Sequence, residues 1–258
     1  MILLINIGDY VTRKSYNNDI VFKVVDIDKD IYYLYGVCVR LSADSPLSDL
    51  VKYEGNINEE EFNVKMDEYF NLDRNEYFYI PGSILHIDGD KGFLDRSMNF
   101  YKSNKIKAYG VYSPEDELET SIYSYLEKYS PDILVITGHD ALFRKERTIG
   151  KYKNTNNFVK AVRMARKYEK SQDKLIIIAG ACQSNYEELI KAGANFASSP
   201  KRINIHALDP AIIATSLSFS DRNKNIDLLN ILEKTKYGSD GIGGIITKGT
   251  MYVGYPRK

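Results

Sequence analysis

The chain has 258 residues, enough for one large domain or two small ones. Hydrophobic residues make up 43% of it, so we expect a packed core. Because 35 basic residues balance 35 acidic ones, the charge argues against a protein dedicated to coating nucleic acid. No apolar stretch approaches the ~18 residues of a membrane helix, and the apolar start at 1–7 is too short for a signal peptide. The two cysteines and three histidines exclude a disulfide framework and a four-cysteine zinc site.

The first 55 residues are predicted to form a small β-barrel module. Runs rich in aromatic and β-branched residues, at 19–27 and 31–40, are separated by the polar turn 28–30. The Gly-Asp-x-Val start at Gly8 favours an SH3-like barrel, with Cys38 inside a strand and in its core. Residues 56–78 are acid-rich and are predicted to form a linker with a helical piece.

Residues 79–258 alternate between predicted strands and predicted helices. Apolar runs at 84–88, 107–112, 132–137 and 174–179, and a weaker one at 195–199, predict strands. Helices are predicted at 93–104, 157–170, 185–192 and 209–219, and from Ser113, as N-cap, to the residue before Pro131. This pattern predicts an α/β fold with a parallel sheet that is covered by helices on both faces. The glycine-rich stretch 241–244 is predicted to be a turn before a last strand at 250–254.

Polar residues with catalytic potential follow two of these strands. His139 comes directly after the strand 132–137, and Cys182 follows the strand 174–179. In parallel sheets the functional groups lie beyond the carboxyl ends of the strands. A helix predicted to start near Ser184 would lower the pKa of the Cys182 thiol and offer N–H groups to an oxyanion. We therefore predict that Cys182 is a nucleophile and that His139 is its general base and acid.

An apolar strand ending in Gly-His, followed by one ending in Ala-Cys, is similar to the caspase, gingipain and clostripain clan of cysteine peptidases. The resemblance implies a caspase-like, flavodoxin-like sheet and a reaction without cofactor or metal. The oxyanion would be held by the N–H of Cys182 and a second one near Gly138 or Asp140. Asp140 stands where the clan usually has glycine.

Several blocks of sequence resemble the YabG family of sporulation-specific proteases. They are residues 7–16, 39–47, 134–141, 179–184 and 198–206, so the resemblance extends over nearly the whole chain. It implies a cysteine endopeptidase of the mother-cell cytoplasm, associated with the forming spore coat. Its partners would be spore coat and other spore proteins, not nucleic acid or membrane, and it would cut them next to basic residues, with arginine favoured.

A pocket that takes arginine needs a buried carboxylate. Asp88 and Asp90 follow the first strand of the α/β domain, at the same edge as Cys182 and His139. We favour Asp88, with Asp140 and Asp209 as rivals. The simpler alternative is that Asp88 and Asp90 only form a turn.

Two other functions remain open. In an amidotransferase-like hydrolase, Cys182 would sit on a nucleophile elbow and pair with the downstream His206. In a non-catalytic, flavodoxin-like binding module the thiol would be inert. His86 is predicted to be a core residue. The basic segment 144–174 is interpreted as a solvated helix, or as a docking surface for acidic coat proteins, and self-cleavage at 144–147 is a further hypothesis. The oligomeric state is left open.

Overall fold

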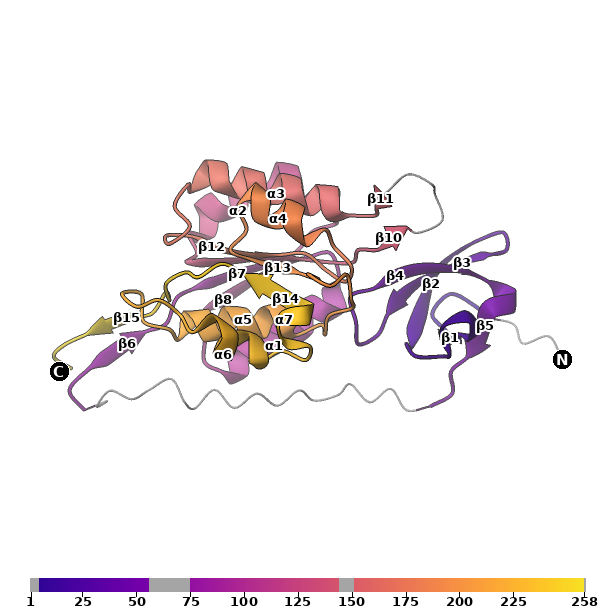
Figure 1. The fold of residues 1–258 in the computed structure, drawn as a ribbon, viewed down its shortest axis with the longest axis horizontal. Helices are drawn as coiled ribbons and strands as arrows, with labels where there is room; N and C mark the ends of the chain where they lie inside the picture. The colour runs from indigo at the N-terminus through magenta and orange to yellow at the C-terminus, as the bar shows by residue number, and fades with distance from the viewer. Residues whose placement is uncertain (1–4, 56–74, 144–150, 258) are drawn as a thin grey trace.

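The computed structural model describes residues 5–55, 75–143 and 151–257. Figure 1 shows an antiparallel sheet, formed by the N-terminal residues, at one end of a larger α/β unit. Most of the predicted linker at 56–78, residues 56–74, and the hypothetical cleavage site at 144–147 lie outside the described residues. Among the helices described, none has the length and apolar character to cross a membrane.

The N-terminal sheet has five antiparallel strands in the order β4-β3-β2-β1-β5. Their bounds are β1 Tyr10–Arg13, β2 Phe22–Asp28, β3 Ile31–Gly36, β4 Ser42–Pro46 and β5 Leu50–Lys52, with short 3-10 helices at Lys14–Tyr16 and Leu47–Asp49. The expectation that β3 continues to residue 40 is wrong. The chain folds back after Gly36, whose N–H donates to the carbonyl of Leu41, so Cys38 lies half-buried outside the strands and not within one.

The α/β unit is built on a six-stranded sheet with the order β14-β13-β12-β9-β7-β8. The strands are β7 Ile84–Asp88, β8 Ala108–Tyr112, β9 Ile133–Thr137, β12 Ile176–Ala179, β13 Phe196–Ser198 and β14 Ile242–Gly244. The first five are parallel, and β14 joins the edge antiparallel to β13. The first strand of the unit, β7, has neighbours that come later in the chain on both sides. The strand order therefore reverses there, and ligands bind at such points in doubly wound sheets.

Helices cover both faces of this sheet (Figure 1). One face carries α2 Leu118–Tyr129, α3 Thr155–Tyr168 and α4 Tyr186–Ala192, and the other carries α1 Lys91–Ser103, α5 Asp209–Ser218, α6 Leu228–Glu233 and α7 Gly238–Gly241. Alternate residues of β9 enter two separate core clusters, Ile133 and Val135 on one face and Leu134 and Ile136 on the other. Because these strands are buried on both faces, they appear in the sequence as continuous apolar runs. The first cluster continues into the N-terminal sheet, so the two parts share one core.

Two local predictions are corrected. The helix expected from Ser113 begins at Leu118, because residues 114–117 form a turn in which the N–H of Glu117 donates to the carbonyl of Pro114. The glycine-rich stretch at 241–244 is not a turn but largely the strand β14. A Cβ on Gly244 would lie 2.5 Å from the ring of Phe196, so glycine lets the edge strand approach closely.

The remaining strands form two small pairs. β6 Phe78–Ile80 pairs with β15 Tyr252–Gly254, which brings the C-terminal residues back to the start of the α/β unit. β10 Leu142–Phe143 pairs with β11 Lys151–Tyr152 just beyond the end of β9. Helix α4 ends at Gly193, which has a left-handed backbone with φ of +114°.

Candidate active site

Cys182 and His139 follow adjacent parallel strands at equivalent positions. In the register of β9 and β12, Ile136 is paired with Ala179. His139 lies three positions after Ile136, and Cys182 lies three positions after Ala179. The loops are also tied together, because the Oγ of Ser184 donates to the carboxylate of Asp140 at 2.8 Å. The structure therefore brings the predicted thiol and imidazole loops to one edge of the sheet.

The Cys182 side chain is fully buried, and its sulfur contacts the backbone of Ile205. The N–H of Ile205 donates to Sγ at 3.3 Å, and the thiol can donate to the carbonyl of Ile205 at 3.6 Å. Burial raises the pKa of this thiol to about 12, although the hydrogen bond from Ile205 and the nearby Arg40 act against it. The expectation of a lowered thiol pKa is therefore wrong for this conformation. Helix α4 begins only at Tyr186, and desolvation outweighs any effect of its N-terminus.

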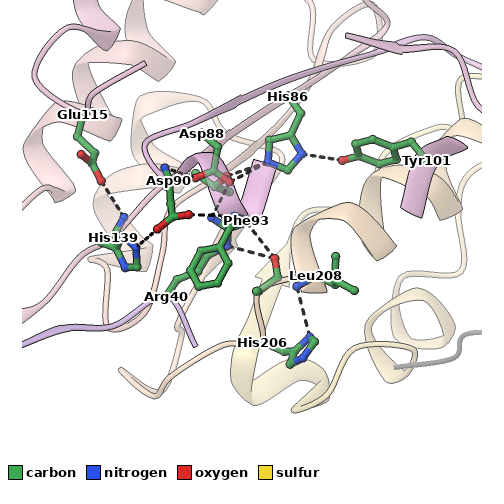
Figure 2. Close-up of polar contacts among 12 residues, drawn as sticks. Arg40, His86, Asp88, Asp90, Phe93, Tyr101, Glu115, His139, His206 and Leu208 are labelled. Carbon is green, nitrogen blue, oxygen red and sulfur yellow. Dashed lines mark hydrogen bonds and ion pairs between the residues drawn. The ribbon is translucent and has the colours of Figure 1, made fainter. Parts of the chain in front are cut away.

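The His139 imidazole is held on several sides (Figure 2). Its Nε2 lies 3.0 Å from Oδ2 of Asp90, and its ring stacks on Tyr35 with 4.0 Å between ring centroids. Phe93 approaches the ring at 5.4 Å, and Glu115 accepts the backbone N–H at 2.8 Å. Asp90 is acceptor-only when ionised, so Nε2 carries the proton. The buried Nδ1 has no hydrogen-bond partner among the described residues and is left as a base.

Asp90 is an ionised partner for this imidazole. Burial alone would raise the pKa of Asp90, but the hydrogen bond from His139, with the N–H of Phe93, holds that pKa below its usual value. Asp90 also caps α1, because its Oδ1 accepts the N–H of Phe93 at 2.9 Å. The helix start therefore fixes the carboxylate that orients the histidine ring.

A cavity of about 710 Å³ opens between the N-terminal sheet and the start of α1. Tyr35, Asp90 and Phe93 belong to its wall, and each of them also contacts His139. The wall of the cavity therefore includes side chains that contact His139, while His139 itself is fully buried and is not part of that wall.

Asp140 organises the loop after β9. Its carboxylate accepts the N–H groups of Ala141 and Asn154 and the hydroxyls of Thr155 and Ser184. Burial raises the pKa of Asp140, against the effect of these four donors. The side chain is thus fully used inside the fold, which removes it as a rival for binding arginine. Gly138, also predicted to lie near the oxyanion, packs against the side chain of Glu115. A Cβ on Gly138 would lie 2.5 Å from Oε1 of Glu115.

Asp88 lies at the end of β7 in a buried polar chain. Its Oδ2 accepts from Nη1 of Arg40 at 2.7 Å and from the hydroxyl of Thr137 at 2.9 Å. Nε2 of His86 donates to that hydroxyl at 2.8 Å, and Tyr101 donates to Nδ1 at 2.9 Å. Burial would raise the pKa of Asp88, but Arg40 and His86 hold it well below its usual range. Burial also lowers the pKa of His86, whose full burial confirms the predicted core position.

Arg40 is the site residue that the sequence interpretation missed. It comes from the loop after β3 and reaches across to the α/β unit, where its side chain is fully buried (Figure 2). The available signal was a single arginine within the otherwise apolar run Val37-Cys38-Val39-Arg40-Leu41, because a buried arginine requires a partner of opposite charge.

His206, the rival of His139, also lies close to the thiol, since it follows Ile205. Its N–H donates to Asp209 at 2.9 Å, and its Nδ1 accepts the N–H of Leu208 at 3.3 Å. Burial raises the pKa of Asp209 to about 6, against the N–H donors of Lys236 and His206. No group of three or more His, Cys, Asp or Glu side chains in the described parts of the chain is arranged to hold a metal ion.

These features define an α/β protein with a thiol and an oriented imidazole at neighbouring strand ends. A family profile described as YabG peptidase U57 matches residues 6–256. The chain is also 40% identical, over 284 aligned residues and 98% of both chains, to the sporulation-specific protease YabG of Bacillus subtilis (strain 168). The chain therefore belongs to the YabG peptidase U57 family, a family of proteases. A comparison with solved structures found no match.

Proposed function

We propose that the protein is a sporulation-specific cysteine endopeptidase that processes spore coat and related spore proteins next to basic residues, with arginine favoured. Membership of the YabG peptidase U57 family and the similarity to the sporulation-specific protease of Bacillus subtilis support the protease and sporulation parts. The protein would act in the mother-cell cytoplasm, at the forming spore coat. Residues 1–55 would form an accessory module, 56–78 a linker and 79–258 the peptidase domain.

The observation that carries this proposal is the equivalent position of Cys182 and His139 beyond two adjacent strands. With Asp90 on Nε2, the free Nδ1 of His139 is the atom that takes the proton of the thiol. Sγ then attacks the scissile carbonyl, and the same nitrogen returns the proton to the leaving amine. Water completes the reaction by hydrolysing the thioester. Asp90 is a positioning residue, since it acts through His139.

The thiol must leave its present contacts before it can react. A thiol with a pKa of about 12 is almost entirely protonated at neutral pH, and only the thiolate is an effective nucleophile. A rotation of Sγ away from Ile205 and toward the imidazole would give the proton a direct acceptor. The N–H of Cys182, with a second one near Gly138 or Asp140, would stabilise the oxyanion.

Arginine preference would come from Asp88. Its carboxylate is buried, ionised and already bound to a guanidinium, that of Arg40, at the strand end next to the reacting groups. A bidentate or charge-assisted contact of this kind discriminates arginine from neutral side chains. Asp90, the other candidate, is engaged by His139.

The strand order supports a caspase-like fold for the peptidase domain. Numbered along the chain, the five parallel strands of the sheet have the flavodoxin-like order 2-1-3-4-5, with an antiparallel strand at the edge. The five-stranded antiparallel sheet, with a 3-10 helix before its last strand, supports the SH3-like interpretation of the N-terminal module.

The test is cleavage of a ten-residue peptide that contains one arginine, with the cut mapped by mass spectrometry. We expect the wild type to cut after the arginine and Cys182→Ala to be inactive. Cys38→Ala is the matched control, because it removes the other thiol and should remain active. Equal cleavage by wild type and Cys182→Ala would refute the mechanism.

A second candidate is an amidotransferase-like hydrolase in which Cys182 pairs with His206. The contact of Sγ with Ile205, the residue before His206, favours it. Mutation distinguishes the pairing of Cys182 with His139 from its pairing with His206. Activity that survives in His139→Ala but not in His206→Ala would support this alternative. A flavodoxin-like binding module without catalysis would show no cleavage by any variant.

A further inference from the structure

The chain's own residues 39–42 lie extended across the strand ends of the candidate active site. Val39 forms an antiparallel bridge with His206, and the preceding carbonyl, that of Cys38, accepts the N–H of Ala207 at 3.3 Å. On the other side, the N–H of Ser42 donates to the carbonyl of Asp140 at 3.3 Å. Backbone pairing on both sides of a reaction centre is how an extended peptide is held by β-strand addition.

Arg40 is the residue of this segment that enters the fold. Its Nη1 lies 2.7 Å from Asp88, while its Nε and Nη2 both donate to the carbonyl of Ala207, at 3.2 and 3.0 Å. The guanidinium carbon lies 4.9 Å from the centre of the Phe93 ring. Carboxylate, carbonyl and aromatic face together form a complete arginine site, and Arg40 fills it with no exposed surface.

The backbone of Arg40 meets the reacting group. Its carbonyl oxygen accepts the N–H of Cys182 at 3.4 Å, and this N–H is the proposed oxyanion donor. A substrate cut after arginine would need its carbonyl oxygen on that donor and its guanidinium on the buried carboxylate. One residue of the chain, Arg40, meets both requirements at once.

We propose that residues 39–42 are an internal pseudosubstrate, in which Arg40 occupies the arginine pocket of the peptidase and holds the folded chain in a self-inhibited state. The inference rests on the proposed function, since it assigns Asp88 to the arginine pocket and the N–H of Cys182 to the oxyanion. It adds that the N-terminal module regulates the site. The buried thiol, held on Ile205 under this segment, belongs to the resting state.

The expected effect follows from competition for one pocket. When the binding-competent state is only a fraction of the population, the apparent dissociation constant for substrate rises by the inverse of that fraction. If the pocket is vacant in about 1–10% of molecules, removal of Arg40 lowers the KM for an arginine peptide by about 10- to 100-fold. A purely structural Arg40 gives a different result, because its loss would loosen the site and leave KM unchanged or raise it.

The experiment compares the steady-state kinetics of full-length wild type and Arg40→Gln on an arginine-containing peptide. Arg166→Gln is the matched control, because Arg166 is also well bonded, to the carbonyls of Leu175 and Gly193, and lies away from the site. We expect KM to fall at least about ten-fold in Arg40→Gln and to be unchanged in Arg166→Gln. Arg40→Lys keeps a charge but loses the fork on Ala207, and its KM should be intermediate; this variant decides the question if Arg40→Gln does not fold.

The outcomes separate the two proposals. The pseudosubstrate proposal is overturned if folded Arg40→Gln has the KM of wild type, or if folded Arg40→Lys does when Arg40→Gln does not fold. In that case the proposed function still stands, provided that cleavage depends on Cys182. If wild type and folded Arg40 variants all fail to cleave arginine peptides, the proposed function fails and the pseudosubstrate fails with it.

Discussion

Breaking the ion pair between Arg40 and Asp88 tests how the N-terminal module is fixed to the α/β unit. Both side chains are fully buried, and the charged atoms lie 2.7 Å apart. Removal of one partner leaves an uncompensated buried charge, which costs about 3–5 kcal/mol of unfolding free energy. For a chain of this size, each kcal/mol lowers the melting temperature by about 2–4 °C, so Arg40→Met and Asp88→Asn should each melt roughly 10 °C earlier than wild type.

The double variant Arg40→Met with Asp88→Asn sharpens this prediction. It leaves no unpaired charge, so its loss of stability should be smaller than the sum of the single losses by about 2 kcal/mol or more. Urea unfolding, followed by circular dichroism, measures all four proteins. The exposed pair Lys160 and Glu119, at 2.9 Å, serves as a control, with an expected coupling below about 1 kcal/mol. Additive losses at Arg40 and Asp88 would refute the reasoning.

Three further predictions concern the reacting groups and pH. His139→Ala should lower kcat on an arginine peptide by about 10²- to 10⁴-fold while His206→Ala keeps activity, and the reverse order would contradict the proposed pairing. Asp90→Asn should lower kcat by up to about 10⁴-fold with KM nearly unchanged, because the imidazole loses its orienting charge; a change in KM alone would argue against this role. Asp209 has a folded pKa of about 6, above the ordinary value for a carboxyl, so the stability linked to its protonated form is present below about pH 4 and declines as pH rises through 6. Thermal melts of wild type and Asp209→Asn between pH 4 and 7 measure this, and an identical pH dependence of the two would refute it.

The sequence predicted the parts of the fold that have strong local signals. Strand β9 was predictable because every residue from Ile133 to Thr137 is buried, which produces a continuous apolar run. The helix predicted at 185–192 corresponds to α4, which ends at Gly193, where the left-handed backbone favours glycine. The start of α2 was misplaced, since Ser113 and Pro114 carry the local signature of a helix start while the chain forms a turn that directs Glu115 to the N–H of His139.

The neighbourhood of Cys182 and His139 was predictable from topology, but their surroundings were not. Parallel strands bring their carboxyl ends to one edge, so two strand-end residues meet without any knowledge of side chains. The role of Asp90 depends on the cap of α1, and that of Arg40 on a loop nearly fifty residues away from Asp88 in the chain. Such long-range contacts leave no periodicity in the sequence. The raised thiol pKa likewise follows from burial, which strand-end position does not determine.

The most direct test of the account is covalent labelling with a peptide electrophile that carries arginine next to a chloromethyl ketone. Wild type and Arg40→Gln would be treated with this probe and with a matched probe that carries norleucine, and the modified residue located by mass spectrometry. We predict an adduct on Cys182 with the arginine probe, faster in Arg40→Gln than in wild type, and little with norleucine. An adduct confined to Cys38, or equal labelling of Cys182 by both probes, would contradict the assignment of an arginine-directed cysteine peptidase.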